Sequence, residues 1–296
     1  MNLRKIKEYK ADLLLLSVAI SWGLTFLMVQ DAIQNVPVYA FLFWRFFIAS
    51  ILMFIIAYKH YSKINMQSIF YGFVLGCILF AGFATQTFGL LYVKSSIVAF
   101  ITGFNVVFVP FLALVFFKKK IYSNVLVSAF VALLGLYLLT MSGSLEFAYG
   151  EILVLVCALM FALHIVLTGE FSHKANVFII VCFQFLTVTV LSMCFSLGLE
   201  EMTFILPLDA TLVKAVLITA VFATVYAFLI QTYMQQYTSA SKAAIIFTME
   251  PVSAAFFGVY VGDEFLSPYQ IGGAILIILA TVISEVRFRK KVKTKL

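Results

Sequence analysis

Ten apolar runs of about 20 residues follow one another along the chain, and they constrain the fold more than any other feature. As a helix, each run could cross about 30 Å of hydrocarbon. Strands of a membrane barrel would alternate apolar and polar residues, which these runs do not. We therefore predict an all-α polytopic membrane protein with ten transmembrane helices. The expected spans are residues 11–30, 37–57, 67–91, 96–117, 122–141, 149–168, 176–198, 211–235, 243–261 and 268–286.

Composition also supports a membrane protein, and the absence of several motifs excludes some of its possible functions. Charged residues make up 11% of the chain, against about 25% in soluble domains, and the mean hydropathy is +1.10. The four cysteines lie inside apolar runs without paired spacing, as expected for small buried side chains. No phosphate-binding loop, His-x-x-x-His or Cys-x-x-Cys motif occurs. The sequence thus predicts neither ATP hydrolysis nor a metal or other cofactor.

A polar signature occurs twice at one offset. The segment Gln86-Thr-Phe-Gly-Leu-Leu-Tyr92 is followed 145 positions later by Gln231-Thr-Tyr-Met-Gln-Gln-Tyr237. Matched polar residues are harder to attribute to composition than matched hydrophobic ones. We predict an internal duplication, with one repeat over 11–141 and a second over 149–286. Basic segments flank the repeats at 1–10 and 287–296.

Basic residues concentrate at alternate connections between the expected spans. With ten crossings, 17 of the 20 Lys and Arg residues fall on one side of the membrane. By the positive-inside rule, both termini are cytoplasmic, and the net charge of +7 needs no nucleic-acid partner. Five helices per repeat is an odd number, so the second repeat should be inverted. Inverted repeats are common in secondary transporters, which bind substrate between the halves near the bilayer midplane. A duplicated bundle for lipid contact, scaffolding or intramembrane chemistry is the alternative.

Several short motifs occur in a fixed order along the whole chain. They are Ser21-Trp22-Gly23, Phe43-Trp44-Arg45-Phe46, Tyr92-x-x-Ser95-Ser96, Tyr237-x-x-Ala240-Ser241, Glu250-Pro251-Val252, Gly262-Asp263-Glu264 and Gln270-Ile271-Gly272-Gly273. In this order they resemble the ten-helix, EamA-type members of the drug/metabolite transporter superfamily. The resemblance implies a central cavity lined by helices 1, 3, 4, 6, 8 and 9, with helices 5 and 10 peripheral. It also implies export or exchange of small metabolites such as amino acids.

Glu250 is the only carboxylate well inside an apolar run. A charge there costs at least about 2.5 kcal/mol on insertion scales, so it should face a cavity or a partner, or be protonated. Pro251 disturbs the preceding helical turn, and Pro110 and Gly103 could loosen the corresponding helix of the first repeat. Glu250 could handle substrate or protons, or it could bind a neighbouring helix at a structural kink.

Polar and aromatic side chains in the expected helices supply further candidates. Unpaired amides and phenols are costly in lipid, so they should point into the bundle, where they join helices or line an aqueous path. Trp22, Thr25 and Phe26 share one helical face. Arg45 could bind a substrate carboxylate, act as an outer gate, extend its charged group to the membrane surface (snorkelling), or pair with Asp31 or another outer acid. The candidate substrate-binding residues are Trp22, Thr25, Phe26, Gln86, Asn105, Gln231, Tyr237 and Glu250; those for gating or structure are Arg45, Tyr92, Pro110, Pro251 and Glu264.

Together these features predict a secondary transporter in the inner (cytoplasmic) membrane. Its partners would be the lipid bilayer and a small-molecule substrate, with export by alternating access as the expected mechanism. Transport could be coupled to protons or facilitative. The missing central acid in the first helix, whose carboxylates Asp12 and Asp31 lie near its ends, favours neutral or zwitterionic substrates. An intramembrane lipid-modifying enzyme would need clustered polar catalytic residues, whereas the three histidines are scattered. A non-transporting assembly subunit is the other alternative.

Overall fold

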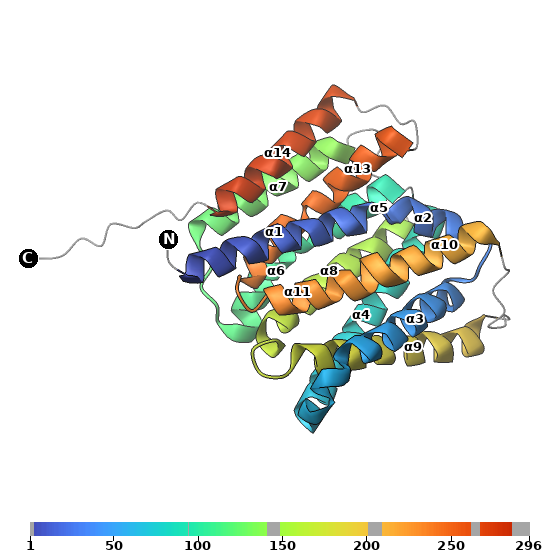
Figure 1. Ribbon diagram of the computed structural model, residues 1–296. Helices are drawn as coiled ribbons and strands as arrows, with labels where there is room; N and C mark the ends of the chain where they lie inside the picture. The colour runs from blue at the N-terminus through green and yellow to red at the C-terminus, as the bar shows by residue number, and fades with distance from the viewer. Residues whose placement is uncertain (1–2, 94, 141–148, 201–208, 262–266, 286–296) are drawn as a thin grey trace, which may run out of the picture.

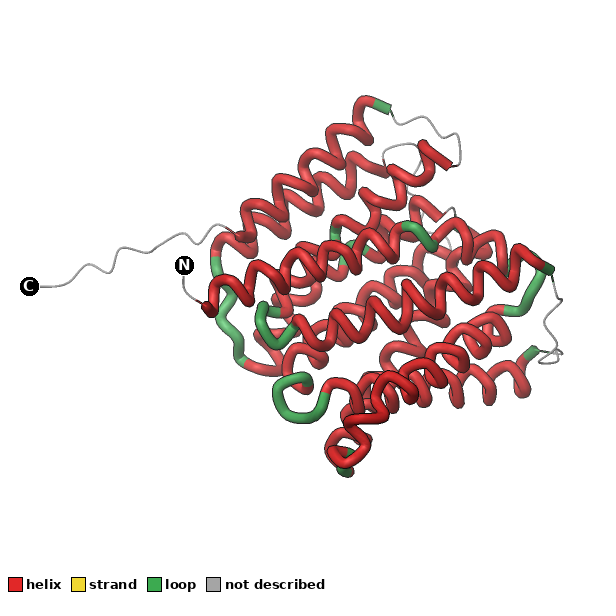
Figure 2. Tube along the Cα trace, viewed as in Figure 1, coloured by secondary structure: helices red, strands yellow, loops and turns green. Residues whose placement is uncertain are grey.

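The computed structural model describes residues 3–93, 95–140, 149–200, 209–261 and 267–285. These residues form a bundle of helices joined by short turns, without a strand among them (Figures 1 and 2). The start of α1 and the end of α14 lie at the same end of the bundle (Figure 1). We call this end the terminal end and the other the distal end.

The helices of the first half of the chain follow its apolar runs. They are α1 (Leu3–Gly23), α2 (Phe26–Ala32), α3 (Val38–Ala57), the 3₁₀-helix η1 (Tyr58–Lys63), α4 (Met66–Tyr92), α5 (Ser95–Thr102), α6 (Asn105–Phe117) and α7 (Ser123–Thr140). Residues 3–10, expected as a basic segment before the first helix, are already part of α1.

The second half contains a similar series. It comprises α8 (Tyr149–Phe171), α9 (Val177–Leu199), α10 (Ala210–Ile218), the π-helix η2 (Thr219–Tyr226), α11 (Ala227–Met234), α12 (Ala240–Phe247), α13 (Met249–Val261) and α14 (Pro268–Glu285). Asn176 begins α9 because its side chain accepts hydrogen bonds from the N–H groups of Phe178 and Ile179.

The helices establish a polytopic membrane protein. In the described part of the chain, seven helical stretches are long and apolar enough to cross a membrane. They are Lys7–Ala32, Val38–Lys63, Met66–Tyr92, Ile97–Phe117, Tyr149–Phe171, Val177–Leu199 and Ala210–Met234. Ser123–Leu138 and Ile271–Ala280 are shorter apolar helices. Ten crossings and an inverted repeat therefore stay predictions.

Glycines allow α4 to pack closely on its neighbours. A Cβ atom at Gly72 would lie 2.7 Å from the carbonyl oxygen of Ile180 on α9, and one at Gly76 would lie 2.7 Å from that of Gln184. These two glycines are four residues apart on one helix face, a spacing typical of close membrane-helix contacts. The helices α7 and α14 pack together at one edge of the bundle (Figure 1), away from the central cavity.

Candidate functional site

Several helices are interrupted where they pass the centre of the bundle. Between α5 and α6 lie Gly103 and Phe104, and between α12 and α13 lies Thr248. Thr248 Oγ1 donates to the carbonyl of Ile245 at 2.6 Å, which satisfies one helix-end acceptor. Gly103 and Thr248 are 145 positions apart, the offset of the repeated signature. Both halves therefore contain a broken helix at corresponding positions.

The two prolines lie beside these breaks and not at them. Pro110 is inside α6, whereas Pro251 occupies the first turn of α13, where a missing N–H costs little. Between α1 and α2, Leu24 and Thr25 form a third interruption, and Thr25 Oγ1 donates to the carbonyl of Trp22 at 2.9 Å. The π-helix η2 is a fourth irregular segment, of a type that often marks functional sites.

Residues at or beside the three helix breaks line a cavity of about 50 Å³, and η2 packs behind its wall through Trp22 and Arg45. This volume is well below the range of typical small-molecule sites, about 300–1,000 Å³, so a metabolite could enter only when the bundle opens. The walls combine aromatic rings with buried polar side chains. The lining residues are Trp22, Thr25, Phe26, Val29, Arg45, Phe83, Gln86, Thr87, Leu90, Asn105, Phe161, His164, Ile165, Phe228, Gln231, Phe247 and Glu250.

Glu250 and Asn105 take corresponding places in this cavity. Each comes just after a helix break, and the two are 145 positions apart. Glu250 is 8% exposed, and within the described ranges its carboxylate has neither an ion pair nor a hydrogen bond. The Oδ1 atom of Asn105 is buried and also lacks a hydrogen-bond partner there. Buried polar atoms are normally satisfied, so two unpaired acceptors at one cavity indicate a site for a polar ligand.

Arg45 provides a buried positive charge in the same wall. Its Nε donates to Thr224 Oγ1 at 2.8 Å, and its Nη2 donates to the carbonyl of Ala223 at 3.4 Å. The guanidinium carbon lies 4.4 Å from the ring centroid of Phe83, within cation–π distance. Among the described residues, no carboxylate pairs with Arg45, so neither snorkelling nor a bond to Asp31 occurs. A guanidinium has five N–H donors, which leaves several for a ligand.

Trp22 forms an aromatic wall and is held in place by η2. Its Nε1 donates to the carbonyl of Ala223 at 3.0 Å. Its ring lies 5.4 Å from that of Phe228 and 5.1 Å from that of Phe247, between centroids. These spacings are typical of favourable ring pairs. Trp22 and Arg45 thus share one acceptor on the π-helix.

The two glutamines of the repeated signature both reach the cavity. Gln86 Nε2 donates to Thr102 Oγ1 at 3.2 Å, next to the break between α5 and α6. Gln231 Nε2 donates to Gln235 Oε1 at 3.3 Å, and Gln235 in turn donates to the carbonyl of Ile165. The Oε1 atom of Gln231 is buried without a partner in the described structure. The amides therefore connect helices and still offer an acceptor to the cavity.

Comparison with known proteins identifies the family. The EamA-like transporter family matches the chain twice, over residues 9–141 and 148–285. The chain belongs to the EamA-like transporter family. An uncharacterized transporter of Archaeoglobus fulgidus is 35% identical over 282 residues, covering 95% of this chain and 88% of its own. The uncharacterized transporter YyaM of Bacillus subtilis is 24% identical over 291 residues, covering 95% of each chain.

A solved structure shares the fold of this EamA-like transporter. A crystal structure superposes with a TM-score of 0.78 at 14% identity, covering 93% of this chain and 96% of its own. The family match and the 35% identical relative confirm the resemblance to the drug/metabolite transporter superfamily, EamA type. The protein is a membrane transporter.

Some predicted residues of this EamA-like transporter lie away from the cavity. Tyr237 contacts Tyr233, with ring centroids 6.1 Å apart, and lies near Lys7. Tyr92 is largely exposed, with its ring against Tyr149. Glu264 lies outside the described residues.

The cavity of this EamA-like transporter also contains side chains absent from the predicted set. His164 is 1% exposed and bonds through Nε2 to Gln184 Oε1 at 3.3 Å. As a polar residue in an apolar run, it carried the same signal as the predicted amides. Phe83, Phe161 and Phe228 gave no such signal, because 33 phenylalanines are spread over the chain.

The two ends of this EamA-like transporter are held by different contacts. At the terminal end, Lys242 Nζ of α12 lies 2.7 Å from Asp12 Oδ2 and 3.5 Å from Glu8 Oε1, both on α1. At the distal end, the Glu200 carboxylate after α9 accepts from the N–H groups of Tyr39 and Ala40 at 2.7 and 3.0 Å. A carboxylate at the start of α3 also interacts favourably with the helix dipole.

Proposed function

We propose that this protein is a secondary transporter that exports a small zwitterionic metabolite, such as an amino acid, across the cytoplasmic membrane. The observation that carries the proposal is one cavity with two buried ionisable side chains of opposite type, Glu250 and Arg45, neither of which has an ion-pair partner among the described residues. A zwitterion supplies the missing partner of each: its ammonium for Glu250 and its carboxylate for Arg45.

Electrostatics supports a substrate that carries both charges. Leaving a buried ion without a partner costs several kcal/mol, whereas charge-assisted hydrogen bonds are among the strongest in proteins. A substrate with only one charge would leave either Glu250 or Arg45 without a partner. The aromatic rings of Trp22, Phe161 and Phe228 would enclose an apolar side chain of the substrate.

Alternating access is supported by the broken helices and by the contacts at the two ends. Half-helices that meet at the midplane are typical of secondary transporters, in which one bundle rocks against the other around a fixed site. Opening at the terminal end would break the pairing of Lys242 with Asp12 and Glu8. Opening at the distal end would break the bonds from Glu200 to α3. By the positive-inside rule, we assign the terminal end to the cytoplasm.

Proton coupling follows from competition at Glu250. A proton and a substrate ammonium group cannot both bind the same carboxylate oxygens favourably, because protonation removes the negative charge. A proton that enters from outside would therefore release the substrate outward. Substrate affinity should fall as the pH falls and Glu250 becomes protonated.

Counterflow in liposomes tests the substrate class. The full chain is reconstituted, loaded with unlabelled leucine, and exposed to labelled leucine in the presence of three competitors. These are leucine, the amine that lacks its carboxylate and the acid that lacks its ammonium. We expect leucine to compete at least tenfold better than either single-charge analogue, in line with about 1.5–3 kcal/mol for a bond to a charged group.

The matched control is Asp31→Asn, which removes an exposed carboxylate of α2 outside the cavity. It should exchange leucine like the wild type. If no amino acid exchanges, or if the amine competes as well as leucine, the zwitterion hypothesis is wrong.

A further inference from the structure

A second hollow, of about 400 Å³, lies at the terminal end of the bundle. It is formed by the connection from α6 to α7, the end of α8 and the start of α12. None of its lining residues belongs to the central cavity. The polar residues that define it are Lys118, Lys119, Lys120, Glu170, His173 and Ser239.

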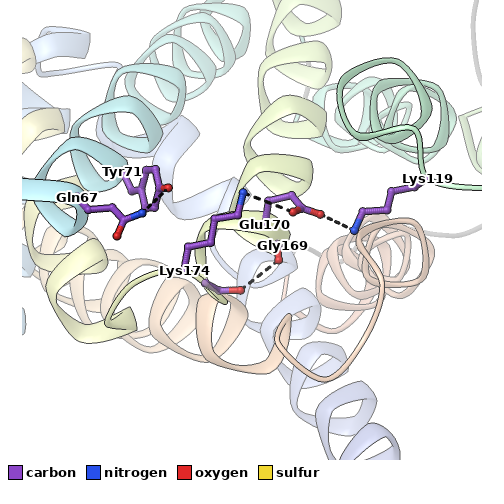
Figure 3. Close-up of polar contacts among 7 residues, drawn as sticks. Gln67, Tyr71, Lys119, Gly169, Glu170 and Lys174 are labelled. Carbon is purple, nitrogen blue, oxygen red and sulfur yellow. Dashed lines mark hydrogen bonds and ion pairs between the residues drawn. The ribbon is translucent and has the colours of Figure 1, made fainter.

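The hollow has an excess of positive charge. Glu170 is already engaged, because its carboxylate lies 2.6 Å from Lys119 Nζ and 3.9 Å from Lys174 Nζ (Figure 3). Lys118 and Lys120 have no ion pair with any residue for which the structure gives a placement. Two ammonium groups at the rim are therefore available to an anion.

The backbone fixes where these lysines lie. Lys118 adopts a left-handed conformation, with φ of 51°, directly after α6. Its N–H donates to the carbonyl of Leu114 and that of Lys119 to Ala113, which closes the helix end in a defined turn. The lysine triplet thus belongs to an ordered turn at the mouth of the hollow.

The start of α12 adds a second source of positive potential. Ser239 caps this helix, its Oγ accepting from the N–H of Lys242 at 3.2 Å. Ala240 and Ser241, the first residues of the helix, line the hollow. Helix N-termini favour anions, because their first N–H groups lack partners within the helix.

Exposed apolar side chains lie beside this charged hollow. Val115, Phe116 and Tyr122 are 72%, 57% and 68% exposed, and they flank the lysine triplet in the chain. In a bilayer such side chains face acyl chains, and Tyr is typical of the headgroup level. A basic pocket between helices at this level suits an anionic lipid headgroup.

We propose that this hollow binds the phosphate group of an anionic phospholipid, whose acyl chains lie along the exposed side chains of α6 and α7. Lys118 and Lys120 bind the phosphate oxygens, together with the start of α12. The apolar surface distinguishes a lipid from a free phosphate ion, which would gain nothing from it.

Native mass spectrometry of the full chain tests this proposal. The protein is purified in detergent with equal amounts of phosphatidylglycerol and phosphatidylcholine, and the bound lipids are counted. The test variant is K118Q/K120Q. The control variant K59Q/K63Q removes the same charge from exposed lysines of η1, which line neither this hollow nor the central cavity.

We expect the wild type and the control to retain phosphatidylglycerol preferentially, and the test variant to lose this preference about fivefold or more, as expected for lysines near an anionic surface. Equal losses in the two variants would overturn the proposal, since the lysines would then act only through net charge. Complete displacement of the lipid by millimolar glycerol phosphate would overturn it as well, because the site would then bind soluble phosphate. An unchanged preference for phosphatidylglycerol in K118Q/K120Q would also overturn the proposal.

Discussion

The broken helices α5–α6 and α12–α13 have the same design but different chemistry. Each places a polar residue at the cavity just after its break, Asn105 in the first and Glu250 in the second. The first break contains Gly103, and the second contains Thr248, whose hydroxyl bonds to the carbonyl of Ile245. An amide is neutral, whereas a carboxylate can exchange a proton or bind a cation. The two breaks thus share a scaffold, and only the second of them places a titratable side chain at the cavity.

This difference indicates that the helix breaks and the charged side chains serve separate purposes in this protein. The breaks form the cavity in both halves. The positive counterpart of Glu250 comes from Arg45 on α3, outside both broken helices. Changes that make the two breaks more alike should therefore affect substrate selection without removing the cavity.

Glu250→Gln should have the largest effect on transport, because it makes the second break chemically similar to the first. Loss of the charged partner should weaken substrate binding by about 30-fold or more, equivalent to about 2 kcal/mol or more. Counterflow and pH-driven uptake in liposomes should both fall. If pH-driven uptake alone is lost and counterflow survives, Glu250 handles protons without binding the substrate. The exposed acid variant Asp31→Asn is the control.

Gly23→Ala should have the next largest effect, through the position of Glu250. The added Cβ would lie 2.6 Å from the carbonyl oxygen of Glu250 and 2.8 Å from the backbone nitrogen of Ala254. Backbone must therefore move, at a cost of about 1–3 kcal/mol. We expect a lower melting temperature in detergent and weaker substrate exchange.

Gly103→Ala is the matched control at the other break. Its Cβ would lie 3.0 Å from Leu136 Cδ2, the end of a flexible side chain, and 3.1 Å from the carbonyl oxygen of Phe100, a few tenths of an ångström closer than usual, and Gly103 does not have a positive φ. The free energy of unfolding of this variant should differ from that of the wild type by less than about 1 kcal/mol. Equal destabilisation by both substitutions would contradict a special role for the contact between α1 and α13.

Sequence reasoning locates the helices well, because apolar runs and caps are local signals. It anticipates the two breaks from Gly103 and Pro251, since both residue types disturb helices. It does not anticipate η2, whose segment Thr219–Tyr226 contains neither Gly nor Pro. Its carbonyl at Ala223 bonds to Trp22 and Arg45, contacts that exist only in the folded bundle.

The sequence predicts the polar residues of the cavity but not its aromatic lining. Buried polar residues such as Gln86 and Asn105 stand out in apolar helices, and the structure brings them together. Tyr237 is polar as well, yet it lies near a helix end beside Lys7 and so outside the cavity. Its polarity alone does not show at which level of the bundle it lies. The aromatic lining cannot be found without the fold, because any of the phenylalanines could face lipid.

Asn105→Asp should have an intermediate effect, by giving the first break the charge of the second. An added carboxylate would attract ammonium groups and repel carboxylates. We expect the preference to shift toward the single-charge amine by about tenfold relative to leucine, as for one new bond to a charged group. Competition in the counterflow assay measures this ratio. An unchanged ratio would mean that the side chain of residue 105 does not reach the substrate.

Trp22→Phe should have the smallest effect, since it keeps an aromatic ring and removes only the bond from Nε1 to the carbonyl of Ala223. One neutral hydrogen bond contributes about 1 kcal/mol, so substrate affinity should fall no more than about fivefold. Trp22→Ala, which also removes the ring contacts with Phe228 and Phe247, should cost more. If both variants lose the same substrate affinity, the bond from Trp22 to η2, and not the ring contacts, is what positions α1 for substrate binding.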